Sequence, residues 1–123
     1  MLRLWQKLNV TAFVVSGLAM MRTDLIGEQY VDGSAATYLP MFAHPLIVLT
    51  GPSPKVRRAF LRAAERGLRS TVYTRELFST GNDVDNRAAV ARVTTTDPDV
   101  VGFAVAGTPR SVDKALDGLR LHP

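Results

Sequence analysis

The sequence predicts a three-layer α/β/α domain built around a small mixed sheet that is mainly parallel. Two continuous apolar runs, 46–50 and 100–106, have the length and composition of strands buried on both faces. Each run ends in a glycine, and a proline then opens a helical pattern. A third β-rich run occupies 71–74. Strands that alternate with helices favour parallel pairing through crossover connections, with helices on both sheet faces.

The composition is that of one globular domain spanning residues 1–123, with 46% hydrophobic and 21% charged residues. There is no cysteine, which excludes disulfides, thiolate catalysis and cysteine-based zinc sites. His44 and His122 are the only histidines, so a multi-histidine metal site is also excluded, and we expect neither a metal nor a cofactor. The net charge of +4 favours an anionic partner, although a charge of this size also serves solubility alone.

The first long element covers residues 4–21, LWQKLNVTAFVVSGLAMM. A signal peptide fits poorly because Asn9, Thr11 and Ser16 interrupt the apolar run, which is also shorter than the roughly 20 residues that cross a bilayer. We predict instead a helix covered on most sides, and we expect a cytoplasmic protein with no membrane partner. The predicted inward stripe consists of Leu4, Leu8, Ala12, Val15 and Ala19.

The middle of the chain predicts a short hairpin and a strand–helix–strand unit. Residues 30–33 and 37–39 have the pattern of a strand, a turn and a strand. In 46–74, Ser53 is the expected N-cap and Pro54 the first helical residue, with Gly67 ending the helix. This unit implies parallel strands joined by a right-handed crossover.

The C-terminal part predicts two more helices around the strand 100–106. Asn82 or Asp83 caps a helix that runs to about Val93, with an inward stripe of Val84, Ala88 and Ala91. Gly107-Thr108-Pro109 then starts a last helix over 110–119.

No classical phosphate loop or nucleophile elbow is present, so the candidate site comes from strand ends. In open α/β sheets, ligands bind outside the carboxyl ends of the strands. These ends carry Thr50-Gly51, Gly107-Thr108 and, with three polar side chains in a row, Thr74-Arg75-Glu76. The alternative for that triplet is a helix cap beside a surface ion pair.

Several segments resemble the second half of the type II peptidyl-tRNA hydrolases: AERGL at 64–68, VGFAVAGTP at 101–109 and VDKALDGLRL at 112–121. A closer resemblance is to the domain-of-unknown-function 2000 family of that superfamily, in WQKLNVTAF at 5–13, YLPMF at 38–42 and VYTRELF at 72–78. The resemblance covers nearly the whole chain and implies a peptidyl-tRNA hydrolase II-like fold.

The resemblance also implies a hydrolase that cuts the ester at a tRNA 3′ end. The type II enzymes have a lysine at the start of the first helix, where Lys7 stands, and an aspartate after the strand that matches 71–74, where Glu76 is the nearest carboxylate. Lys7 would stabilise developing negative charge, while Glu76 and Thr74 would position water. Arg75 would contact phosphate, and the remaining expected substrate contacts are Trp5, Gln6 and Asn9.

Two other functions stay open. The same cleft would serve a non-catalytic module that binds tRNA, another nucleic-acid end or an anionic small molecule. A dimeric scaffold is the third possibility. The resemblance further implies a central strand before the first helix, and only Met1-Leu2-Arg3 precede that helix here. We therefore expect the N-terminal central strand to be absent, and the 123-residue chain to be less stable than an upstream-extended form and to pair with another chain, for example as a homodimer.

Overall fold

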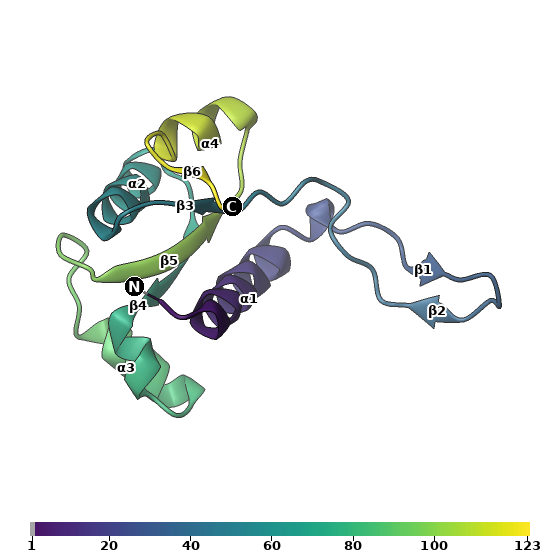
Figure 1. The fold of residues 1–123 in the computed structure, drawn as a ribbon, viewed down its shortest axis with the longest axis horizontal. Coiled ribbons are helices and arrows are strands. Elements are labelled where there is room, and N and C mark those ends of the chain that lie inside the picture. Colours follow the sequence, from purple (N-terminus) through teal and green to yellow (C-terminus); the bar gives the residue numbers. More distant parts are fainter. Residues whose placement is uncertain (1) are drawn as a thin grey trace.

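A computed structural model describes residues 2–123 as a mixed α/β fold with small sheets (Figure 1). Within these residues the helices are α1 (Leu4–Met21), α2 (Ser53–Glu65), α3 (Asp83–Ala91) and α4 (Pro109–Ala115), with 3-10 turns η1 (Thr23–Leu25) and η2 (Arg75–Ser79). The strands are β1 (Tyr30–Val31), β2 (Thr37–Tyr38), β3 (Leu49–Thr50), β4 (Ser70–Thr74), β5 (Val100–Val105) and β6 (Arg120–Leu121).

All three strand ladders are antiparallel, so the predicted mainly parallel sheet is wrong. The longest ladder joins β4 to β5, from Ser70 opposite Val105 to Thr74 opposite Val100. β3 pairs with β6 and not with β4, so the expected parallel crossover within 46–74 does not form. Of the apolar run 46–50, only Leu49–Thr50 forms a strand, and β6 was not expected at all. Apolar patterning carries no information about which strand will be the partner.

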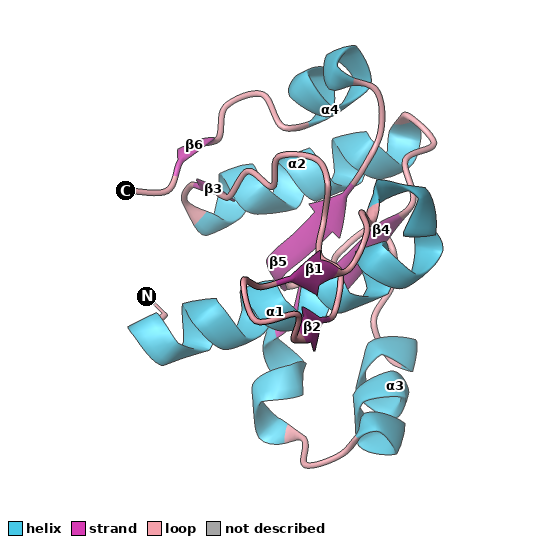
Figure 2. Ribbon diagram, turned by 90° about the vertical axis from the view of Figure 1, so that its right-hand side faces the viewer, coloured by secondary structure: helices cyan, strands magenta, loops and turns pink. Residues whose placement is uncertain are grey.

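Helices cover both faces of the β4–β5 ladder, as predicted (Figure 2). Neighbouring residues of a strand point to opposite faces, and β5 uses this alternation. Gly102 lies against Val10 of α1, whereas the ring of Phe103 meets Phe60 of α2 with centroids 5.4 Å apart. α4 packs on α2 and does not cover the sheet directly.

The helix α1 has the predicted ends, but it is covered on one side only. Its buried side chains are Val10, Val14 and Leu18, and the hydroxyl of Thr71 on β4 donates to the Val14 carbonyl at 2.7 Å. The predicted stripe beginning at Leu4 and Leu8 is wrong, since both of these side chains are exposed. α1 is apolar nearly all round, so its sequence does not determine which side meets the sheet.

The ends of the second and last helices follow the expected capping chemistry in part, and the last helix ends at Ala115 and not at 119. Pro52, not Ser53, is the N-cap of α2. Gly67 has a φ of +73°, which allows it and Leu68 to donate to the carbonyls of Ala64 and Ala63 after the helix. Thr108 caps α4 by accepting from the Ser111 N–H at 3.3 Å.

The helix α3 begins as predicted but buries a different residue. The Asn82 side chain accepts from the Asp85 N–H at 2.9 Å and so caps the helix. Ala89 is its buried residue, and the expected stripe is wrong because Val84 is 69% exposed. No helix within residues 2–123 is both long and apolar enough to cross a membrane.

The predicted hairpin is confirmed in β1 and β2 and extends away from the rest of the molecule (Figure 1). Its turn is organised by Asp32, whose carboxylate accepts from the Ser34 and Ala36 N–H groups and from the Tyr38 hydroxyl at 2.7 Å. The bond from Tyr38, followed by the two backbone bonds, lowers the pKa of Asp32. A bridge between Ile26 and Phe42 closes the base of the hairpin.

The contact between α1 and β5 predicts the effect of Gly102→Ala. A Cβ atom at position 102 would lie 2.7 Å from Val10 Cγ1, and Val10 is buried against the sheet. We expect the free energy of unfolding, measured by urea denaturation, to fall by about 1–3 kcal/mol. Gly81→Ala is the matched control, because no atom lies within 4 Å of its Cβ position. Equal losses in the two variants would contradict the close-packing argument.

Candidate functional site

A groove with a volume of about 880 Å³ runs between β3 and β5. Its walls are both residues of β3, all six residues of β5, and side chains of α1 and of the C-terminal segment 116–123. The body of the groove is apolar, with Val10, Val14 and Leu18 of α1 beside Leu116 and Leu119. This shape is typical of a binding site, which is a concave apolar surface with a few polar groups.

One end of the groove collects positive charge. Val10 of α1 packs against Gly102 of β5, and Lys7 lies about one turn before Val10 in the helix. Lys7 therefore lies toward Val100, the first residue of β5. Val100 pairs with Thr74, and Arg75 follows Thr74 in the chain. At the same end, β3 leads through Gly51 and Pro52 into α2. The cations that line the groove are Lys7, Lys55, Arg75 and Arg120, and no Asp or Glu within residues 2–123 lines it. We call these four residues the cationic end.

The helices α1 and α2 both begin at the cationic end, and a helix N-terminus carries a partial positive charge. The Gln6 side chain is already used in the cap of α1, where it accepts from the Arg3 N–H at 2.9 Å. α2 begins after Pro52 without a side-chain cap. Pro54 has no N–H, and the Lys55 and Val56 N–H groups donate to the Pro52 carbonyl, which leaves the Ser53 N–H of the first turn. Both helix termini therefore reinforce the attraction of the cations for an anion.

Arg75 is held in place by Asp99, the residue before β5. The Arg75 N–H donates to the Asp99 carbonyl at 3.0 Å, and its Nε donates to Asp99 Oδ2 at 3.1 Å. Both side chains are about half exposed, so this ion pair contributes little to stability. Only Nε of the guanidinium makes a bond within the described residues, which leaves both Nη groups as donors for a ligand.

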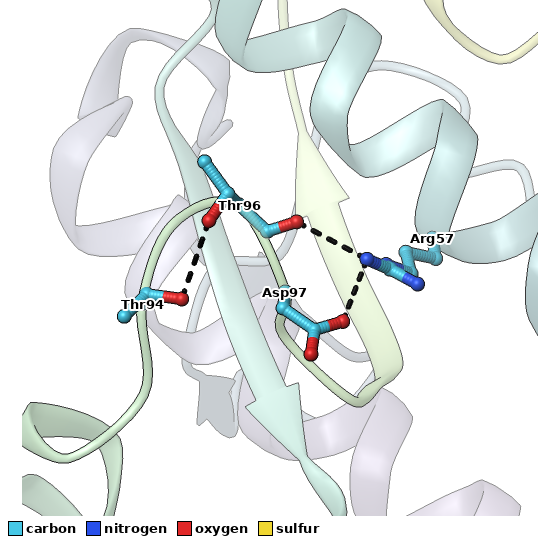
Figure 3. Close-up of polar contacts among 4 residues, drawn as sticks. All are labelled: Arg57, Thr94, Thr96 and Asp97. Carbon is cyan, nitrogen blue, oxygen red and sulfur yellow. Dashed lines mark hydrogen bonds and ion pairs between the residues drawn. The ribbon is translucent and has the colours of Figure 1, made fainter.

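The loop that carries Asp99 is in turn anchored to α2 (Figure 3). Arg57 Nη2 donates to the Thr96 carbonyl at 3.1 Å and to Asp97 Oδ1 at 2.7 Å. A second cavity of about 310 Å³ lies beside this contact, between Ser53 and Val100. Arg57 thus positions the loop, and the loop positions Arg75 through Asp99.

Thr74 is the most buried polar residue of the region, with 2% of its surface exposed. Its hydroxyl oxygen has no hydrogen-bond partner within the described residues. An unpartnered buried hydroxyl carries a free-energy cost, and in native proteins such groups concentrate at functional or strained positions.

The structure brings together only part of the site expected from sequence. Lys7 and Arg75 share the cationic end, and Thr74 is buried next to it in the chain. By contrast, Trp5, Asn9 and Glu76 are exposed and do not line the groove.

Two residues of the cationic end were not predicted. Lys55 lies three residues after Pro52, the N-cap of α2, and so belongs to the N-terminal turn of that helix. Arg120 belongs to β6, which no sequence pattern indicated. No group of three or more His, Asp or Glu side chains within residues 2–123 is placed to hold a metal ion.

Comparison with known proteins identifies one family and one solved structure. Residues 1–123 match the family described as Protein of unknown function (DUF2000). The chain is similar to the solved structure of a protein of unknown function from Agrobacterium tumefaciens strain C58, with 36% identity and a TM-score of 0.96. The match covers 99% of this chain and 90% of that chain. None of the curated proteins compared matches the sequence.

The unpartnered hydroxyl of Thr74 predicts an unusual response to Thr74→Val. Replacing this hydroxyl by a methyl group of similar size removes a buried polar atom that makes no bond, so we expect the free energy of unfolding to rise by about 1 kcal/mol. Thr71→Val in the same strand is the matched control, and it should lower that energy by about 1 kcal/mol because the Thr71 hydroxyl donates to the Val14 carbonyl. Urea denaturation measures both, and a loss in Thr74→Val equal to that in Thr71→Val would show that Thr74 is satisfied in solution.

Proposed function

The chain belongs to the DUF2000 family of proteins of unknown function, and we propose a function for it from the site. We propose that the cationic end binds the phosphate groups of a single-stranded RNA end. The observation that carries this proposal is the charge of the groove: four cations line it and no carboxylate within the described residues does. The ligand is therefore anionic, and neutralising it needs no metal ion.

Two further observations support phosphate as the anion. Phosphate oxygens accept hydrogen bonds from backbone N–H groups at helix N-termini, and α1 and α2 both begin at this end. The planar guanidinium of Arg75 suits phosphate geometry and keeps both Nη groups available while Nε is bound to Asp99.

An RNA end is favoured over a small anion by the residues around the cationic end. Trp5 is in the first turns of α1, as is Lys7, and its indole is 58% exposed. Exposed aromatic rings next to a cationic groove stack on the bases of single strands, which is how many proteins bind single-stranded nucleic acid. Trp5 does not line the groove and lies two residues before Lys7 in α1, so it points to a different side of the helix. The proposed base contact therefore lies outside the groove, around the N-terminal end of α1 from the phosphate contacts of Lys7 and Arg75.

The test is the salt dependence of binding to an RNA tetranucleotide that ends in CCA. For single strands, the logarithm of the binding constant falls with the logarithm of salt concentration with a slope of about −0.7 per phosphate neutralised. Lys7→Ala and Arg75→Ala should each weaken binding by about fivefold and reduce the slope by about 0.7. Fluorescence anisotropy at several salt concentrations measures both quantities.

Two variants act as controls. Lys114→Ala removes the same charge on α4, outside the groove, and should leave the slope unchanged. Asp99→Asn keeps a side-chain oxygen that can accept from Arg75 Nε and removes a negative charge next to the cationic end, so it should tighten binding by about two- to fivefold. If Lys114→Ala weakens binding as much as Lys7→Ala, the RNA is responding to net charge and the assignment of the site is wrong.

Hydrolysis of the ester at a tRNA 3′ end is a second candidate, supported by the buried Thr74 hydroxyl next to Arg75. In this function, which also follows from the resemblance to the peptidyl-tRNA hydrolase II-like superfamily, Thr74 helps to hold the attacking water and Glu76 takes its proton. Lys7 then stabilises the negative charge that develops on the carbonyl oxygen. The exposed position of Glu76 requires the bound substrate to reach it from the edge of the groove.

Release of an N-blocked amino acid from aminoacyl-tRNA tests the second candidate. We expect Lys7→Ala and Glu76→Gln each to lower kcat by at least about 100-fold, which is the usual contribution of a catalytic acid–base group or charge-stabilising group. Glu65→Gln, a matched change at the exposed C-terminal end of α2, is the control and should leave kcat unchanged. Turnover that survives Lys7→Ala, or RNA binding without any turnover, would rule hydrolysis out and leave the binding function standing.

A further inference from the structure

The β1–β2 hairpin and the residues at its base, 26–43, form an arm that extends away from the rest of the molecule (Figure 1). Every residue from 28 to 41 is exposed, so this part of the arm adds no side chain to the core. Large apolar and aromatic side chains gathered on one projecting element indicate a surface that another molecule covers. On the arm these side chains are Tyr30, Val31, Tyr38, Leu39 and Met41.

The arm is held in one shape although it lacks cover. The Gly27 N–H donates to the Met41 carbonyl and the Ala43 N–H to the Leu25 carbonyl at its base, and Asp32 organises its turn. A two-stranded hairpin alone is marginally stable in water, so a partner supplies packing that the arm does not find in its own chain. Because the arm is already ordered, binding costs it little conformational entropy.

A second uncovered apolar surface lies on α1, directly before the arm in the chain. Phe13 and Met20 are 56% and 84% exposed, and they lie on one side of the helix because they are seven residues apart. Met21 follows at the C-terminal end of the helix and is also exposed. The helix has no charged residue between Lys7 and its end, whereas a helix side that faces water normally carries charges. We call Phe13, Met20 and Met21 the helix patch.

Charge favours a second copy of the chain as the molecule that covers the arm. The arm contains Glu28 and Asp32 and no lysine or arginine, and the whole chain has a net charge of +4, so the rest of the chain carries +6. Two arms therefore repel each other, whereas an arm and the body of another copy attract. An anionic lipid surface also repels the arm.

The size of the two surfaces fits a stable dimer. The eight apolar and aromatic side chains of the arm and the helix patch are 40% to 86% exposed. Since each of them presents about 100 Å² to solvent, covering them all removes on the order of 800 Å² from each copy, which is the amount that one partner buries in a standard interface.

We propose that two copies of this chain form a symmetric dimer in which the arm of each copy lies on the helix patch of the other. The same two surfaces then meet twice, as two-fold symmetry requires. Lys7 and Arg75 belong to neither surface, so the proposal does not depend on the proposed RNA binding.

The first test is the mass of the chain in solution, measured by sedimentation equilibrium. Standard-size interfaces have micromolar or tighter affinities, so at roughly 100 μM we expect twice the chain mass of 13.4 kDa. Leu39→Asp and Met20→Asp, which place a charge in the interface but change only exposed side chains of the single chain, should each raise the dimer Kd by about 100-fold or more. Unchanged far-UV circular dichroism shows that each variant is folded.

Val84→Asp is the matched control, because Val84 is 69% exposed and lies on α3, outside both surfaces. It should leave the dimer Kd unchanged. A wild-type chain that is monomeric at this concentration, or a dimer that Val84→Asp weakens as much as Leu39→Asp does, would overturn the proposal.

The second test identifies which surfaces meet, and it uses the absence of cysteine from the chain. A mixture of Leu39→Cys and Met20→Cys chains, oxidised under mild conditions, should give a disulfide between the two variants, whereas Val84→Cys mixed with Met20→Cys should not. Leu39→Cys chains that join only to each other would show that the arms pair with arms, and this result, like the absence of any cross-link, would contradict the helix patch.

Vesicle flotation distinguishes a lipid surface from a second copy. The proposal expects no binding to phosphatidylcholine vesicles. Binding that Leu39→Asp abolishes would assign the arm to a lipid surface and overturn the dimer. Because the RNA titration is read from Lys7 and Arg75, its failure would leave these results unchanged.

Discussion

The antiparallel ladder between β4 and β5 is the constraint on which the rest of the structure depends. It is the longest ladder, and α1 and α2 pack on its two faces through neighbouring residues of β5, Gly102 and Phe103. Because Gly102 has no side chain, α1 approaches the strand closely at Val10. The buried side chains of α1 are Val10, Val14 and Leu18. The same ladder brings Thr74 opposite Val100, which fixes where Arg75 leaves the sheet and where Asp99 meets it.

The polar end of the groove follows from this geometry. α1 and α2 pack on opposite faces of the β4–β5 ladder and begin at the same end of it. The partial positive charges of their N-termini therefore add to the charges of the cations in their first turns. The loop before β5 completes the arrangement through two ion pairs, Arg57 with Asp97 and Arg75 with Asp99. Each pair is weak because it is exposed, yet together they determine which guanidinium faces the groove and which holds the loop.

The sequence predicts the local structure better than it predicts the pairing. The ends of α1, the caps at Asn82 and Thr108 and the glycine after α2 follow from short-range chemistry, and they are confirmed. The strand partners are long-range, and nothing in the alternation of residues distinguishes an antiparallel from a parallel neighbour. For the candidate site, Arg75 follows from its position at a strand end and Lys7 from the family resemblance, whereas Arg120 depends on a two-residue strand whose existence is decided by its partner β3.

The base of the β1–β2 hairpin arm is closed by backbone hydrogen bonds, which isolate the arm from the rest of the domain. The backbone bonds between Gly27 and Met41 and between Ala43 and Leu25 hold the two ends of the arm together whatever lies between them. The distance from α1 to β3 is thus independent of the length and composition of residues 28–40. A substitution or insertion at the tip of the arm therefore leaves the packing of α1 against the sheet unchanged, and its effect is confined to what the arm itself contacts.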